Sequence, residues 1–159
     1  FIMEKIRIAE TARKGYPAFW ERGGGFSNTG EATVICNVDG SPKKAIYVRR
    51  KGHLANDQHA LVSIRRDDFI ITAKHWRNDF EIQVSQVVGL EKEVATYEYE
   101  GELHSYVKWY AIVEEKYHFD NGKWDSKVPE SLNAAIEAAM EKATCYHCRE
   151  PHYVEFDVE

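Results

Sequence analysis

Residues 79–88, DFEIQVSQVV, alternate apolar and polar side chains with the period of a β-strand. Phe80, Ile82 and Val84 fall on one face, and polar residues occupy the positions between them. This pattern is typical of a strand with one face buried against a core. It stands in the middle of a chain in which strand patterns dominate as far as residue 119.

Runs rich in β-branched and aromatic residues extend on both sides of this strand. They are EATVICN (31–37), KKAIYVR (43–49), HALVSI (59–64), DFIITAK (68–74), KEVATYEYE (92–100) and ELHSYVKWYAIVEEKYHF (102–119). In the last run, five apolar residues share one face: Leu103, Val107, Trp109, Ala111 and Val113. Residues 120–123, DNGK, predict a hairpin, because Asn-Gly fits a type I′ turn.

One amphipathic helix of about 14 residues is expected near the C-terminus, beginning after Pro129. Its apolar residues recur at helical spacing: Leu132, Ala135, Ile136, Ala139, Met140 and Ala143. The sequence therefore predicts a mainly β (α+β) fold, a small antiparallel barrel or curved sheet capped by one C-terminal helix. We expect residues 1–127 to form the β domain, and residues 128–159 to pack on it as helix, Cys-rich element and final strand.

Length and composition indicate what class of protein this is. The 159 residues suit one domain, and 43% hydrophobic residues can form a sizeable core. No apolar run is long enough to span a membrane, so we expect a soluble protein. Three cysteines and no signal-peptide pattern favour a reducing, cytoplasmic setting.

The charge is unevenly divided along the chain. Residues 1–80 carry 14 Lys and Arg against 9 Asp and Glu, whereas residues 81–159 carry 7 against 17. An anionic ligand would therefore bind to the first half. The acidic second half disfavours indiscriminate binding to nucleic acid, because that affinity comes from neutralising phosphates.

A Gly-rich segment, ERGGGFSNTG (21–30), joins aromatic and basic residues to a strand. Backbone N–H groups of such a turn can approach an anion closely, arginine pairs with phosphate, and an aromatic face can stack on a base. Basic and histidine-containing loops at residues 49–59 and 75–77 can add contacts. The candidate ligand-binding residues are Trp20, Arg22, Gly24, Gly25, Ser27, Asn28, Thr29, Arg49, Arg50, His53, His59, His75, Trp76 and Arg77.

The histidines allow a second interpretation. His53, His59 and His75, with Asp79, are residue types that a metal-dependent phosphoesterase uses. However, the chain has no H-E-x-x-H, G-x-S-x-G or P-loop pattern, so a non-enzymatic role is favoured.

A second metal hypothesis concerns residues 145–152, CYHCREPH. Cys145, Cys148 and His152 have the spacing of a zinc-knuckle half-site, which would make zinc a structural cofactor. Cys36, His118 or His147 could supply the fourth ligand. The alternative is that the two cysteines are reduced and pack as small hydrophobic residues.

These patterns favour a non-enzymatic binding module for a nucleotide-like or other anionic ligand, acting by sequestration. The outline suits an accessory protein of a phage or mobile element, although no motif carries that impression. The chain could also form a homo-oligomer, since a sheet edge can pair across a two-fold axis. The second alternative to binding an anion is a protein inhibitor or adaptor, in which EKEVATYEYEGE (91–102) presents carboxylates to a basic partner.

Overall fold

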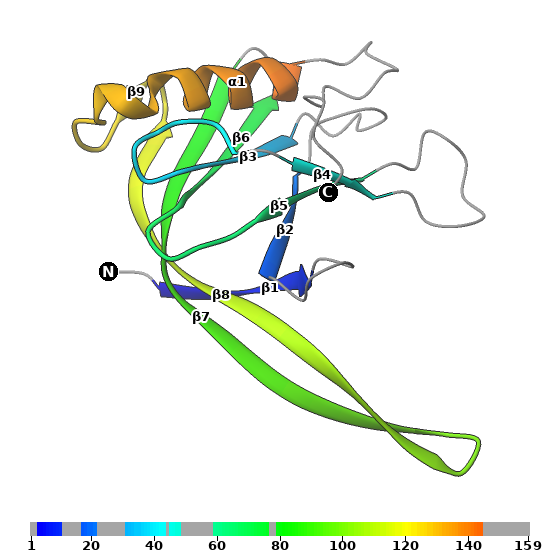
Figure 1. Ribbon diagram of the computed structural model, residues 1–159. Helices are drawn as coiled ribbons and strands as arrows, with labels where there is room; N and C mark the ends of the chain where they lie inside the picture. Colours follow the sequence, from blue (N-terminus) through cyan, green and yellow to red (C-terminus); the bar gives the residue numbers. More distant parts are fainter. Residues whose placement is uncertain are drawn as a thin grey trace.

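Antiparallel strands make up most of the computed structural model, which describes residues 3–10, 17–21, 31–43, 45–48, 59–76 and 79–144. The strands are β1 (Met3–Glu10), β2 (Pro17–Glu21), β3 (Glu31–Cys36), β4 (Ala45–Val48), β5 (His59–Ser63), β6 (Phe69–Trp76), β7 (Asp79–Tyr99), β8 (Glu102–Asp120) and β9 (Lys123–Trp124). Their order is β3–β6–β7–β8–β1–β2–β5–β4, with β9 paired to β8 (Figure 1). The described end strands, β3 and β4, do not pair, so the predicted β fold is confirmed as a curved, open sheet.

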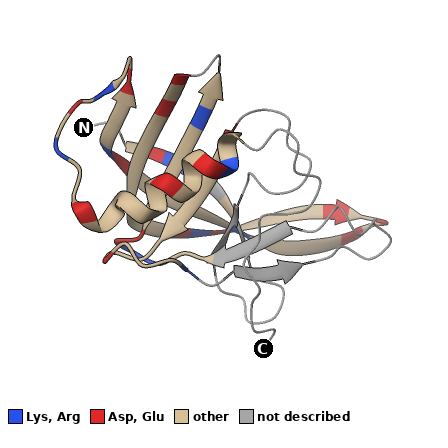
Figure 2. Cartoon of the chain, turned by 90° about the horizontal axis from the view of Figure 1, so that it is seen from above, with Lys and Arg blue, Asp and Glu red and all other residues tan. Residues whose placement is uncertain are grey.

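The predicted helix is also confirmed. A short 3-10 turn (Glu130–Leu132) follows Pro129 and leads into α1 (Asn133–Thr144). The apolar stripe faces the sheet, and α1 lies across β3 and β6 (Figure 2). No helix among the described residues is long and apolar enough to cross a membrane.

The sheet carries one apolar core on each face. Under α1, residues such as Val34, Ile71 and Val84 pack with the helix stripe. On the other face, Ile35 and Ile70 pack with residues of β1 and β8. Every residue of β3 after Glu31 is buried, because successive side chains enter opposite cores.

The β7–β8 pairing has two irregularities, and after each one the side chains of the affected strand point to the opposite face of the sheet. Val84 pairs with Tyr117 and Ser85 with Glu115, which leaves Lys116 as an extra residue in β8. A second shift leaves Val88 extra in β7. Such bulges bend and twist a strand. The same strands therefore serve the helix-side core at one end and the opposite core further along.

Both ends of β8 are tight turns with positive φ at two central residues. Asn121 (φ 53°) and Gly122 (φ 80°) form the predicted Asn-Gly turn, which is thereby confirmed as type I′ in character. Glu100 (φ 51°) and Gly101 (φ 79°) do the same between β7 and β8. This second hairpin joins two runs that the sequence analysis identified separately.

The β7–β8 hairpin is much longer than its neighbours, with strands of 21 and 19 residues. β6 pairs with β7 only as far as Gln86, and β1 pairs with β8 only as far as Trp109. Residues 93–108, which we call the arm, continue beyond both neighbours as a two-stranded ribbon (Figure 1). The arm thus projects from the body of the sheet.

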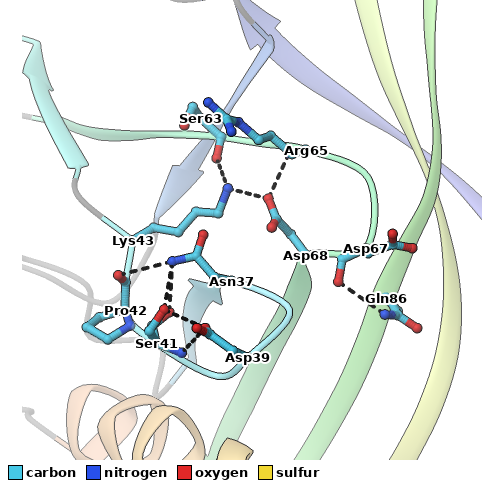
Figure 3. A network of polar contacts seen from close by, with 10 residues as sticks. All are labelled: Asn37, Asp39, Ser41, Pro42, Lys43, Ser63, Arg65, Asp67, Asp68 and Gln86. Atoms are coloured by element: carbon cyan, nitrogen blue, oxygen red, sulfur yellow. Dashed lines mark hydrogen bonds and ion pairs between the residues drawn. The ribbon is translucent and has the colours of Figure 1, made fainter.

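A buried polar network fastens the turn after β3 to the β5–β6 connection (Figure 3). Lys43 and Asp68 form an ion pair in which both side chains are about 5% exposed. Lys43 Nζ also donates to the Ser63 carbonyl (2.8 Å), and the Arg65 backbone N–H donates to Asp68 Oδ2 (2.7 Å). The Val87 N–H donates to the Asp68 carbonyl (2.8 Å), which connects the network to β7.

Gly40 is required where this turn meets the helix. Its φ is +84°, and a Cβ at this position would lie 1.8 Å from the Ser131 carbonyl oxygen. Gly122 has a similar φ of +80° but open space around it. Substitutions at these two glycines therefore distinguish the cost of a side chain at positive φ from the cost of a steric clash.

We predict that Gly40→Ala lowers the free energy of unfolding by about 3 kcal/mol, because strain and a backbone clash add. Gly122→Ala is the matched control and should cost about 1 kcal/mol from strain alone. Urea denaturation of both variants measures the difference. Equal losses would show that the turn does not press against the helix start.

A second prediction concerns the buried ion pair. Lys43→Met leaves the Asp68 carboxylate unpaired, and Asp68→Asn leaves the ammonium unpaired, so each should cost about 3 kcal/mol. The double variant should cost about 2 kcal/mol less than the sum of the two. The measurement is a double-mutant cycle by urea denaturation, and strictly additive losses would contradict the pairing.

Candidate functional site

One face of the arm carries a continuous group of aromatic rings. In the β7–β8 register, Tyr97 lies opposite His104, and Tyr106 is the next residue of β8 on that face. The Tyr97 and His104 rings are stacked with centroids 5.2 Å apart, and Tyr97 and Tyr106 are 5.7 Å apart. Tyr99 extends the group toward the turn, with its centroid 6.4 Å from that of His104. We call Tyr97, Tyr99, His104 and Tyr106 the tyrosine face.

The other face of the arm carries exposed aliphatic side chains, Val94 near the base and Leu103 near the tip. Val94 pairs with Val107, and Glu98 pairs with Leu103. Leu103 is 76% exposed and Val94 is 65% exposed. Large apolar side chains on both faces of a projecting ribbon are unusual for an isolated surface and mark interaction sites.

The charges on the arm are nearly all negative. Residues 93–108 contain four glutamates and one basic residue. Glu98, Glu100 and Glu102 surround the tip, where Figure 2 shows acidic residues gathered at the end of the ribbon. Lys108 lies toward the base, with Nζ 5.7 Å from the Tyr106 ring centroid. The distal part of the arm is therefore apolar and acidic together.

Ion pairs and cation–π contacts brace the base of the arm. Lys5 of β1 reaches Glu91 Oε2 at 3.0 Å, and its Nζ lies 4.3 Å from the Tyr110 ring centroid. Its hydrogen bond to Glu91 raises the pKa of Lys5, so this ammonium stays charged at neutral pH. On the opposite face, Lys92 lies over the Trp109 ring at 5.6 Å. The Lys5 contacts therefore connect the base of the ribbon to β1, and the Lys92–Trp109 contact joins β7 to β8.

The predicted anion site rests mostly on residues outside the described parts of the chain. These residues are Arg22, Gly24, Gly25, Ser27, Asn28, Thr29, Arg49, Arg50, His53 and Arg77. The backbone of Trp20 lies in β2 opposite Leu61, and that of His59 lies in β5 opposite Val48. Only the backbone of these two residues is described.

The strand register does bring the anchor points of these segments together. β2 ends at Glu21 opposite Ala60, and β4 ends at Val48 opposite His59, so the strand ends that precede segments 22–30 and 49–58 lie on either side of the start of β5. At its other end, segment 22–30 enters β3, where Glu31 pairs with Lys74. Both ends of the Gly-rich segment thus adjoin strands that carry a candidate histidine.

His75 and Trp76 lie at the end of β6. The His75 ring is half-buried and tilted against Phe80, with centroids 4.7 Å apart. Trp76 is 69% exposed and pairs through its backbone with Asp79. The Trp76 side chain is therefore largely exposed at the end of β6, and the His75 ring contacts an aromatic neighbour.

The predicted zinc ligands Cys145, Cys148 and His152 lie outside the described residues. Cys36, named above as one candidate for the fourth ligand, is fully buried in the helix-side core. Burial, with smaller contributions from the carboxylates of Asp68 and Asp39, raises the pKa of the Cys36 thiol to about 11. Cys36 is therefore protonated at neutral pH, and thiolate is the form that binds zinc.

The tyrosine face was not identified from the sequence as a site. The signal was present in TYEYEGELHSY, residues 96–106, where tyrosines alternate with glutamates before Glu-Gly and where His104 and Tyr106 follow at a spacing of two after it. Alternation indicates which residues share a face, but it does not show that neighbouring strands stop short and leave that face open.

Comparison with protein families, with curated proteins and with solved structures finds no match to this chain.

Proposed function

We propose that the chain is a protein-binding adaptor or inhibitor that presents its arm to a partner with a Lys- and Arg-rich surface. The observation that carries this proposal is the combination of exposed aromatic and aliphatic side chains with a ring of glutamates on one projecting ribbon. It corresponds to the acidic inhibitor or adaptor alternative raised by residues 91–102.

Each chemical component of the arm has a defined part in such an interaction. Tyrosines are enriched in the central, desolvated regions of protein interfaces and supply most of the affinity there. Carboxylates around them steer a basic partner and reject an acidic one. Among the described strands, the arm's outer edges are also unpaired, so a partner strand could be added to the ribbon.

The charge of the arm argues against nucleic acid as its ligand. Binding to DNA or RNA depends on Lys and Arg that neutralise phosphates. The tip offers Glu98, Glu100 and Glu102 instead. A basic protein surface is the complementary partner.

The direct test uses a basic, aromatic peptide of repeated Arg-Trp units as a probe, titrated into the ¹⁵N-labelled chain. We expect amide shifts centred on residues 93–108. Glu98→Gln/Glu100→Gln/Glu102→Gln should weaken binding about tenfold, since each exposed ion pair contributes roughly 0.5 kcal/mol. The affinity of the unmodified chain should also fall steeply with salt.

The matched control is Glu130→Gln/Glu137→Gln/Glu141→Gln, which removes the same charge from exposed positions on the helix side. It should leave the affinity unchanged. Equal weakening by both triple variants would contradict a specific arm site. Concentration-dependent self-association that disappears with the arm variant would identify a second copy of the chain as the occupant and would also contradict the proposal.

Binding of an anionic, nucleotide-like ligand is a second candidate function, supported by the shared anchor points of segments 22–30 and 49–58. A thermal-shift panel of mono-, di- and cyclic nucleotides tests it. A true ligand at 100-fold excess over its Kd should stabilise the fold by about 2.7 kcal/mol. Arg22→Gln should reduce the shift and Arg66→Gln, at an exposed position elsewhere, should not. No shift with any nucleotide would contradict this function.

A further inference from the structure

Three side chains with metal-binding atoms meet at the end of the β7–β8 hairpin that is farthest from the arm. Glu81 lies on β7, and His118 and Asp120 lie on β8. Their ligand atoms, two carboxylate oxygens and one imidazole nitrogen, all lie within 4.8 Å of one another. The group lies away from the arm and includes His118, which the sequence analysis named as a possible fourth ligand beside Cys145, Cys148 and His152.

The strand register explains why these residues gather. Ile82 pairs with Phe119, and both pack in the helix-side core. The residues next to them in each strand therefore point to the opposite face, where Glu81, His118 and Asp120 lie together. The bulge at Lys116 brings Glu115 onto that face as well, with Oε1 3.3 Å from His118 Nδ1.

The contacts of His118 favour one tautomer. A carboxylate can only accept, so Glu115 beside Nδ1 favours a proton on that nitrogen. In the neutral imidazole, Nε2 then carries a lone pair. A carboxylate on one ring nitrogen and a metal on the other is the arrangement that orients metal-binding histidines in general.

The other nitrogen lacks a hydrogen-bond partner. Nε2 of His118 is shielded from solvent and accepts no hydrogen bond from the residues that the structure describes. Its nearest carboxylate oxygen, Glu81 Oε1, is 3.9 Å away, which is too far for a hydrogen bond. A buried polar atom without a partner is costly, and a bound cation would satisfy it.

The backbone holds two of the three residues in place. Asp120 Oδ1 accepts the Asn121 N–H (2.9 Å) within the tight turn, and Asp125 Oδ1 accepts the His118 N–H (3.0 Å). A cation with ligand bonds of about 2.1 Å holds its ligand atoms about 3.0–3.4 Å apart. The three ligand atoms lie within 4.8 Å of one another, so modest side-chain rotations must shorten their separations when a cation binds.

We propose that Glu81, His118 and Asp120 bind one divalent transition-metal ion of the zinc type, with water completing the coordination. One imidazole and two carboxylates suit zinc, cobalt, nickel or manganese, whereas magnesium and calcium prefer oxygen ligands alone. Glu115 is a positioning residue for His118. The ion would link β7 to β8 beside the β8–β9 turn.

The test is calorimetric titration of Zn²⁺ into the full chain carrying Cys145→Ser/Cys148→Ser, which removes competing thiolates. We expect about one equivalent of zinc, and no detectable heat with Mg²⁺. His118→Ala should abolish the binding, and Glu81→Gln should weaken it at least tenfold. His104→Ala changes the other described, half-buried histidine of β8 and should leave it intact.

Zinc binding that persists unchanged in His118→Ala would overturn the proposal, as would failure of the parent chain to bind zinc. A second readout covers the case in which His118→Ala does not fold. In the chain that keeps His118, zinc should shift the ¹⁵N resonance of the His118 Nε2 atom while the proton stays on Nδ1. A doubly protonated ring that does not respond to zinc would identify an ordinary ion pair with Glu81 and Glu115 and would refute the site.

Discussion

The backbone ladder between β7 and β8 is the constraint on which the rest of the structure depends. It runs from Ile82 opposite Phe119 to Tyr99 opposite Glu102, and tight turns with positive φ close both ends of β8. Register in such a ladder decides which side chains share a face, and a slip of one residue would reverse every assignment. The helix-side core, the carboxylate–histidine cluster and the tyrosine face all depend on that one register.

The ladder also divides the hairpin into regions with different surroundings. Near the 3-10 turn and α1, one face of the strands is covered by helix-side core residues. Beyond the bulges, β1 and the second core cover the same strands. Past Trp109 no described strand flanks the ribbon, and apolar residues that would otherwise be buried reach solvent. We propose that the arm is a surface for a protein partner.

Sequence reasoning identified the strands from β3 to β8, the helix and the Asn-Gly turn, because each depends on local periodicity or on a residue that tolerates positive φ. It did not identify β1 or β2. It placed Leu103 and Val113 on one face of a strand. Only Val113 is buried, since burial depends on which strands lie alongside, and that is a property of tertiary pairing. The Glu81–His118–Asp120 cluster was missed for a similar reason, because Glu81 is 37 residues from His118 and 39 from Asp120 along the chain. The anion-binding role of the Gly-rich segment and the zinc site of the Cys-rich segment stay predictions.

Amide hydrogen exchange of the native chain tests the central claim, a preformed arm continuous with the sheet, most directly. A two-stranded ribbon without a covering layer is only marginally stable alone, so its stability must come from the ladder at its base. We expect the paired amides of residues 93–108 to exchange together, more slowly than unpaired peptide groups and faster than those of residues 82–87. Exchange of the arm at the rate of an unstructured chain would contradict it.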